Sequence, residues 1–135
     1  MTFQEMLALQ GKPKLRNRPR HEEETMQLQC VKWFDYQYPK LKLRLHHSPN
    51  GGKRDEREGA RFKAMGTRAG FPDLILLHPN KFYPFMAIEL KTTKGKQSEQ
   101  QKEYQKMFEE IGAKYIVVRS IDEFISEITN YIKDE

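Results

Sequence analysis

Residues 70–91 read GFPDLILLHPNKFYPFMAIELK, and this stretch decides the fold of the chain. Two apolar runs, at 74–77 and 85–91, flank a turn at 78–84 that contains two prolines. Short apolar runs bounded by turn residues predict buried strands, and so short a connection predicts an antiparallel hairpin. We therefore expect the two strands to pair, which places Asp73 beside the Glu89 end of its neighbour.

Charged side chains are concentrated at this end of the hairpin. Glu89 and Lys91 are two residues apart in a strand, so both point to one face, and apolar residues alternate with them on the other. Two close carboxylates repel each other unless a hard divalent cation lies between them. Such a metal activates water and screens charge on a phosphate, while a nearby lysine orients the water or holds the phosphate. Asp73, Glu89 and Lys91 therefore suggest metal-dependent phosphodiester hydrolysis, although a Pro-Asp turn and a solvated Glu-x-Lys strand face are the common alternatives.

The rest of the chain predicts helices that alternate with strands. Helices are expected over 22–37, 55–65, 97–111 and 121–132, and further strands over 41–46 and 115–118. Their order, α-β-α-β-β-α-β-α, predicts an α/β fold in which helices flank a mixed β-sheet.

Apolar spacing also predicts which faces are buried. The first helix is expected to bury Leu28, Val31, Phe34 and Tyr38. The strand at 41–46 is expected because Leu41, Leu43 and Leu45 alternate with Lys42, Arg44 and His46. The helix at 97–111 is expected to bury Tyr104, Met107, Phe108 and Ile111.

The combined motifs resemble a known nuclease superfamily. Pro72-Asp73, fifteen intervening residues and Glu89-x-Lys91 are similar to the signature of PD-(D/E)xK nucleases. The fuller pattern resembles the VRR-NUC branch, including its stand-alone phage and bacterial members. The further matching pieces are Glu23-x-x-x-Gln27, Tyr38-Pro39-x-Leu41, SPNGGKR at 48–54, Gly66-x-x-x-Gly70 and Lys96-x-Ser98-x-x-Gln101. The resemblance covers residues 23–101 and implies a restriction-endonuclease-like core.

The resemblance also implies site roles. It makes Glu23, Asp73, Glu89 and Lys91 the catalytic set. It makes Asp73, Glu89 and the backbone carbonyl of Leu90 the ligands of Mg²⁺ or Mn²⁺. Glu22 and Glu24 flank Glu23, so the sequence leaves open which of the three faces the site.

Several polar residues are expected to contact nucleic acid. The set is Asn50, Lys53, Arg54, Arg68, Lys94, Lys96, Ser98 and Gln101. Lys53, Arg54 and Arg68 lie near glycines, which allow a duplex to approach closely. Lys94 and Lys96 precede a helix N-terminus, where anions bind readily. The remaining members match the family pattern. For His47, a polar strand end is favoured over a site role.

Composition limits the class of protein. The 135 residues carry a net charge of +5, and residues 11–20 hold five basic residues and no acidic one. We expect a basic, flexible N-terminal extension at 1–20 and one domain at 21–135. A single cysteine excludes an internal disulfide and a cysteine-based zinc site, and no apolar run is long enough for a membrane span. The N-terminus is a poor signal peptide, so the expected location is the cytoplasm, of a bacterial host if the chain is phage-encoded.

The expected function is a Mg²⁺- or Mn²⁺-dependent DNA endonuclease without a small-molecule cofactor. The resemblance implies structure-selective cleavage of branched DNA such as a Holliday junction. A homodimer suits such a substrate because two cuts need two sites. The alternatives are a non-catalytic nucleic-acid-binding module on the same fold, and a nuclease that acts on RNA or on linear duplex.

Overall fold

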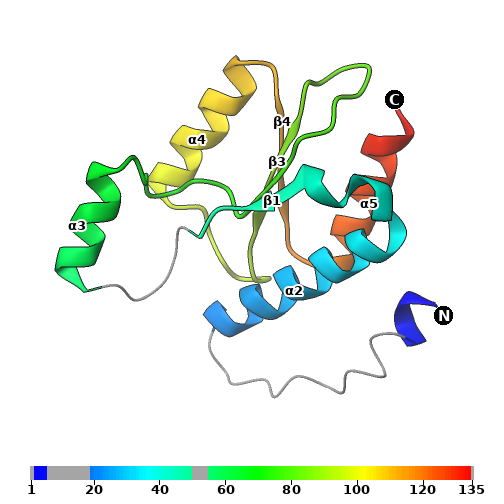
Figure 1. The fold of residues 1–135 in the computed structure, drawn as a ribbon, viewed down its shortest axis with the longest axis horizontal. Helices are drawn as coiled ribbons and strands as arrows, with labels where there is room; N and C mark the ends of the chain where they lie inside the picture. Colours follow the sequence, from blue (N-terminus) through cyan, green and yellow to red (C-terminus); the bar gives the residue numbers. More distant parts are fainter. Residues whose placement is uncertain (1, 6–18, 50–54, 135) are drawn as a thin grey trace.

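The computed structural model describes residues 2–5, 19–49 and 55–134, and these form a four-stranded mixed sheet flanked by helices (Figure 1). In chain order the elements are α2 (Pro19–Gln37), the 3-10 helix η1 (Pro39–Arg44), β1 (Leu45–His47), α3 (Glu56–Ala64), β2 (Leu74–Leu76), β3 (Met86–Leu90), α4 (Glu99–Glu110), β4 (Lys114–Val118) and α5 (Ile121–Lys133). The predicted α/β fold is confirmed.

The sheet has the strand order β1-β2-β3-β4. β2 pairs antiparallel with β1 and with β3, while β3 pairs parallel with β4. The predicted hairpin is confirmed: Leu74 lies opposite Ile88, so Asp73 comes beside the end of β3 that carries Glu89. The parallel pair β3–β4 is possible because α4 provides the crossover between its strands.

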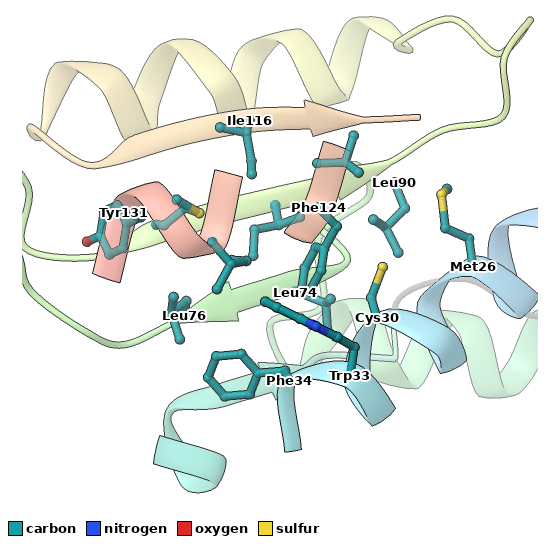
Figure 2. Packing of buried hydrophobic residues seen from close by; sticks show 14 residues of the cluster. Met26, Cys30, Trp33, Phe34, Leu74, Leu76, Leu90, Ile116, Phe124 and Tyr131 are labelled. Atoms are coloured by element: carbon teal, nitrogen blue, oxygen red, sulfur yellow. The ribbon is translucent and has the colours of Figure 1, made fainter. Parts of the chain in front are cut away.

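Two apolar clusters cover the two faces of the sheet. The larger cluster joins α2 and α5 to one face, and Figure 2 shows Cys30, Trp33 and Phe34 of α2 beside Leu74 and Phe124. The smaller cluster joins α4 to the opposite face through Ala87, Phe108, Ala113 and Tyr115. β3 is therefore buried on both faces rather than on one, because a helix layer lies over each.

The predicted buried face of the first helix was partly wrong. The side chains that α2 buries are Met26, Cys30, Trp33 and Phe34, whose spacing of four, three and one residues makes one helical stripe. Val31 and Tyr38 pack only at its margin, and Leu28 is 63% exposed. Similarly, α4 buries Phe108 but leaves Met107 37% exposed, and Ile111, its C-cap residue, is 58% exposed.

The predicted strand at 41–46 was wrong over 41–44, and only its last two residues, Leu45 and His46, lie in a strand, β1. Residues Pro39–Arg44 form η1, in which the backbone N–H of Leu41 donates to the carbonyl of Tyr38 at 2.9 Å. Pro39 lies in the first turn, where its fixed φ favours helical backbone and its missing N–H costs nothing. Leu43 is 95% exposed, and pairing with β2 begins only at Leu45.

Side-chain caps define the other helix starts. Asp55, Ser98 and Ser120 each accept a hydrogen bond from a backbone N–H of the first turn of α3, α4 and α5, respectively.

None of the helices in the described ranges is long and apolar enough to cross a membrane. Most of the predicted extension at 1–20 lies outside the described residues, although the half-buried Phe3 packs against the larger apolar cluster.

Candidate active site

The loop before β2 positions Asp73. Gly70 has a φ of +87°, and a Cβ there would approach the backbone of Gln100 and Gln101 to within 2.6–2.8 Å. The loop therefore lies directly against the first turn of α4. Oδ2 of Asp73 accepts a hydrogen bond of 2.7 Å from the backbone N–H of Leu90, which ties the carboxylate to the end of β3.

Glu89 lies deep in the molecule, with 1% of its surface exposed. Its Oε1 accepts a hydrogen bond of 2.5 Å from the hydroxyl of Tyr115 and a longer one of 3.4 Å from Nε2 of Gln97. Its Oε2 is buried and has no hydrogen-bond partner among the described residues. A buried carboxylate oxygen without a partner is costly, so this oxygen indicates a place for a ligand that the chain itself does not supply.

Glu23 of α2 and Lys91, which follows β3, complete the charged cluster. Burial raises the pKa of the Glu23 carboxyl; Lys91 opposes the rise, whereas the charges of Asp73 and Glu89 add to it. Burial likewise raises the pKa of Asp73, against the hydrogen bond from Leu90, and Glu89 raises it further. The four predicted catalytic residues are thus near enough to interact electrostatically, although they come from separate elements.

The structure distinguishes between the three consecutive glutamates. Glu22 is exposed, whereas Glu23 is half-buried and lies close enough to the backbone N–H of Thr92 for this group to lower the pKa of the carboxyl. Glu23 therefore faces the charged cluster, and Glu24 lies at the wall of the pocket next to it.

A pocket of about 440 Å³ opens onto this cluster. It is lined by Glu23, Glu24, Gln27, Leu28, Val31, His47, Asp73 and Leu90. Leu28 and Val31, which were predicted as core, form part of its wall. A ligand in this pocket therefore contacts both carboxylates and an apolar surface.

His47 also belongs to the pocket, although the sequence favoured a polar strand end for it. Its Nδ1 lies 2.6 Å from the carbonyl oxygen of Asp73. A carbonyl only accepts, so Nδ1 carries the proton in this bond. The signal for this placement is the pairing of His47 with Leu74, which brings β1 next to the residue before β2.

The donor atoms are suited to a hard divalent cation. Among the described residues, no three His, Cys, Asp or Glu side chains form a metal-binding group. The ligand set that the resemblance implies, Asp73, Glu89 and the backbone carbonyl of Leu90, would supply two carboxylates and one carbonyl oxygen. Mg²⁺ is usually held by one or two carboxylates together with phosphate oxygens and water, so the unpaired Oε2 of Glu89 fits this set.

The predicted nucleic-acid contacts fall into different environments. Lys94 and Lys96 are exposed in the loop between β3 and α4. Arg68 is exposed, and its Nη1 donates to the carbonyl of Lys63 at 3.1 Å. The other predicted contacts in this set, Asn50, Lys53 and Arg54, lie outside the described residues.

Ser98 and Gln101 form the capping box of α4. The backbone N–H of Ser98 donates to Oε1 of Gln101 at 2.7 Å, and the backbone N–H of Gln101 donates to Oγ of Ser98 at 3.2 Å. Both side chains therefore stabilise the start of α4.

Three residues near the site had no sequence signal. Tyr115 and Gln97 contact Glu89, and Arg119 donates from Nη1 to the carbonyls of Thr92 (2.8 Å) and Gly95 (2.7 Å). Burial and the hydrogen bond to Glu89 raise the pKa of Tyr115, which keeps its hydroxyl a donor. Tyr115 appeared in the sequence only as part of a buried strand.

Comparison with known proteins agrees with this geometry. The family model of the VRR-NUC domain matches residues 20–122, which include the whole charged cluster. A solved structure of a VRR_NUC domain protein is similar at a TM-score of 0.74 and 33% sequence identity, over 89% of this chain and 93% of that one. The search of curated proteins gave no match. This chain therefore belongs to the VRR-NUC domain family of nucleases, with the mixed-sheet core that its sequence predicts.

Proposed function

We propose that the protein is a Mg²⁺- or Mn²⁺-dependent endonuclease that hydrolyses phosphodiester bonds in branched DNA. The observation that carries the proposal is the buried Oε2 of Glu89, which lacks a hydrogen-bond partner in the part of the chain that the structure describes and lies at the end of the hairpin that also holds Asp73. Family membership supports a nucleic-acid substrate.

The carboxylates of Asp73 and Glu89 and the carbonyl of Leu90 would hold the metal ion. When bound, that ion supplies an activated water and stabilises charge on the phosphate. Asp73 is held for this task by the N–H of Leu90 at 2.7 Å. Because Oδ2 accepts this bond, Oδ1 is the oxygen that we assign to the metal.

Lys91 and Glu23 would assist the carboxylates that hold the metal. The ammonium group of Lys91 holds the scissile phosphate or orients the attacking water. Glu23 lies close enough to Lys91 for their charges to interact, so it helps to fix the position of that ammonium group. Lys94 and Lys96, in the following loop, provide phosphate contacts that position the strand.

The preference for a four-way junction and the homodimer belong together in this proposal. A junction is resolved by two symmetric cuts, and a twofold dimer supplies two equivalent sites. Analytical ultracentrifugation of the protein alone and with a junction tests the dimer; a monomer in both samples contradicts that part.

The test of the activity is a cleavage assay with a panel of four-way junction, flap, linear duplex and RNA substrates, in Mg²⁺, Mn²⁺ or EDTA. We expect metal-dependent cuts in the junction. Asp73→Ala and Lys91→Ala are expected to lose at least about 100-fold in rate while still binding DNA. Lys133→Ala is the matched control, because Lys133 is exposed in the last turn of α5.

Other outcomes separate the alternatives. Cleavage by Asp73→Ala or Lys91→Ala at the wild-type rate would refute the proposed mechanism. Binding without cutting under every metal condition would favour the non-catalytic module. A faster reaction on RNA or on linear duplex would contradict the branched-DNA substrate while leaving the chemistry intact.

A further inference from the structure

We propose that Tyr115 is a positioning residue that holds the Glu89 carboxylate so that Oε2 faces the candidate metal site. This inference rests on the proposed function and extends it to a residue outside the predicted catalytic set. It is argued from the contacts of one carboxylate and from the element that carries the donor.

Tyr115 reaches Glu89 because of the parallel pairing of β3 with β4. Tyr115 lies opposite Ala87, and Val117 lies opposite Glu89. Alternate residues of neighbouring strands share a face, so Tyr115 and Glu89 are on the same side of the sheet, the side that α4 covers. From this position the Tyr115 hydroxyl donates to Oε1 of Glu89 at 2.5 Å.

The donor is held firmly in place. Tyr115 is buried, and its ring packs against Phe108 of α4 with a centroid distance of 6.1 Å. A phenol has few rotatable bonds, so a packed ring places its hydroxyl more precisely than a longer polar side chain does. The direction of the Glu89 carboxylate is therefore determined by the packing between β4 and α4.

The two oxygens of Glu89 are treated unequally. Both protein donors, the Tyr115 hydroxyl and the more distant Nε2 of Gln97, approach Oε1. Gln97 is itself oriented by Gln105, whose Oε1 accepts from the same Nε2 at 2.9 Å. No described residue donates to Oε2, although this oxygen is buried.

This asymmetry argues against a purely structural hydrogen bond. A carboxylate buried only for stability is expected to have both oxygens satisfied, since each unpaired one costs free energy. Groups that hydrogen-bond to a metal-binding carboxylate from outside orient it, and their loss weakens metal affinity by about 10–100-fold. Tyr115 has the place and the chemistry of such a group.

The test compares two variants that each lose one buried hydroxyl. Tyr115→Phe removes the bond to Glu89, and Tyr131→Phe removes a bond of 2.6 Å to the carbonyl of His78, which is remote from the charged cluster. Mn²⁺ affinity is measured by electron paramagnetic resonance of the free ion, without DNA, and folding is checked by thermal unfolding in EDTA.

We expect Tyr115→Phe to weaken Mn²⁺ binding by at least about 10-fold, and Tyr131→Phe to change it by less than about twofold. Affinity within about twofold of wild type in Tyr115→Phe would overturn the inference alone. Equal weakening in both variants would also overturn it, because it would reveal only general destabilisation.

Asp73→Ala separates this inference from the proposed function. If wild type binds no Mn²⁺, or if Asp73→Ala binds as wild type does, the metal site itself fails and the inference fails with it. A second measurement uses only the wild-type protein, so it does not depend on the folding of a variant. In NMR spectra of protein labelled with ¹³Cζ-tyrosine, Mg²⁺ is expected to shift the Tyr115 resonance and not that of Tyr131. An unmoved Tyr115 resonance at saturating Mg²⁺ contradicts the inference.

Discussion

Replacing Gly70 with alanine should destabilise the fold through the contact between the loop before β2 and the start of α4. Gly70 has a φ of +87°, and an added Cβ would lie 2.6 Å from the carbonyl carbon of Gln100 and 2.8 Å from the backbone nitrogen of Gln101. Backbone atoms at the start of a capped helix do not move aside easily. Gly66 offers a matched control, because its φ is +109° but nothing lies within 4 Å of its Cβ position.

The expected magnitude is the sum of two effects. An L-residue at positive φ costs about 1–2 kcal/mol, and the lower entropy of the unfolded alanine chain offsets about 0.4–1 kcal/mol of this. Both variants carry that conformational cost. Gly70→Ala also forces the first turn of α4 to shift, and such overpacking costs about 1–3 kcal/mol. We therefore expect Gly70→Ala to lose about 1–3 kcal/mol more of the free energy of unfolding than Gly66→Ala.

Urea unfolding followed by circular dichroism in EDTA measures both losses under one condition. The slopes of the two transitions must agree with wild type, so that the free energies can be compared. If the two variants differ by less than about 0.3 kcal/mol, the close approach of the loop to α4 is refuted. A Gly66→Ala loss as large as that of Gly70→Ala would show that backbone conformation alone explains the effect.

Three further predictions concern charge, capping and exposure. Burial raises the pKa of Asp73, so above that raised pKa its charged form destabilises the folded state. Asp73→Asn removes this charge and should therefore raise Tm in EDTA at pH 8 by about 2–4 °C. The gain in Tm should fade as the pH falls through the raised pKa toward the ordinary value for aspartate. A gain that grows on acidification would contradict that sign. Ser98→Ala removes the capping box of α4 and should cost about 1 kcal/mol in urea unfolding, with an unchanged value speaking against the cap. Leu43→Ala should change the free energy of unfolding by less than about 0.5 kcal/mol because the side chain is exposed, whereas Leu76→Ala, in the core, should cost about 2–5 kcal/mol. Similar losses in the two variants would show that Leu43 is buried, as a strand at 41–46 requires.

Much of the fold follows from local signals. The helix at 121–132 and the hairpin at 74–91 are found close to their predicted bounds, because periodic apolar residues and turn residues act within a few positions. The failure at 41–46 is also local in origin. Alternating leucines match a strand, but Pro39 at the start of the segment favours a helical turn, and Leu43 in that turn is 95% exposed.

Some residues of the candidate site were predicted from the sequence, and others are identified only by the tertiary structure. Asp73, Glu89 and Lys91 were identified by spacing, since a hairpin of known pairing brings their positions to one end of the sheet. The choice of Glu23 over its two neighbours depends on how α2 rotates against the sheet, which the run of three glutamates does not encode. His47 and Tyr115 enter through strand pairing between segments far apart in the chain.

The sequence by itself thus determined the family, the order of the elements and the acidic and basic residues of the hairpin, because motif spacing and residue type are properties of the chain. Only the tertiary structure decided that Glu89 is fully buried, that its Oε1 accepts a hydrogen bond from Tyr115, and that its Oε2 has no partner within residues 2–5, 19–49 and 55–134. The physical reason is that burial and hydrogen bonding arise from the packing of β4 and α4 on β3. Neighbours along the chain do not specify that packing.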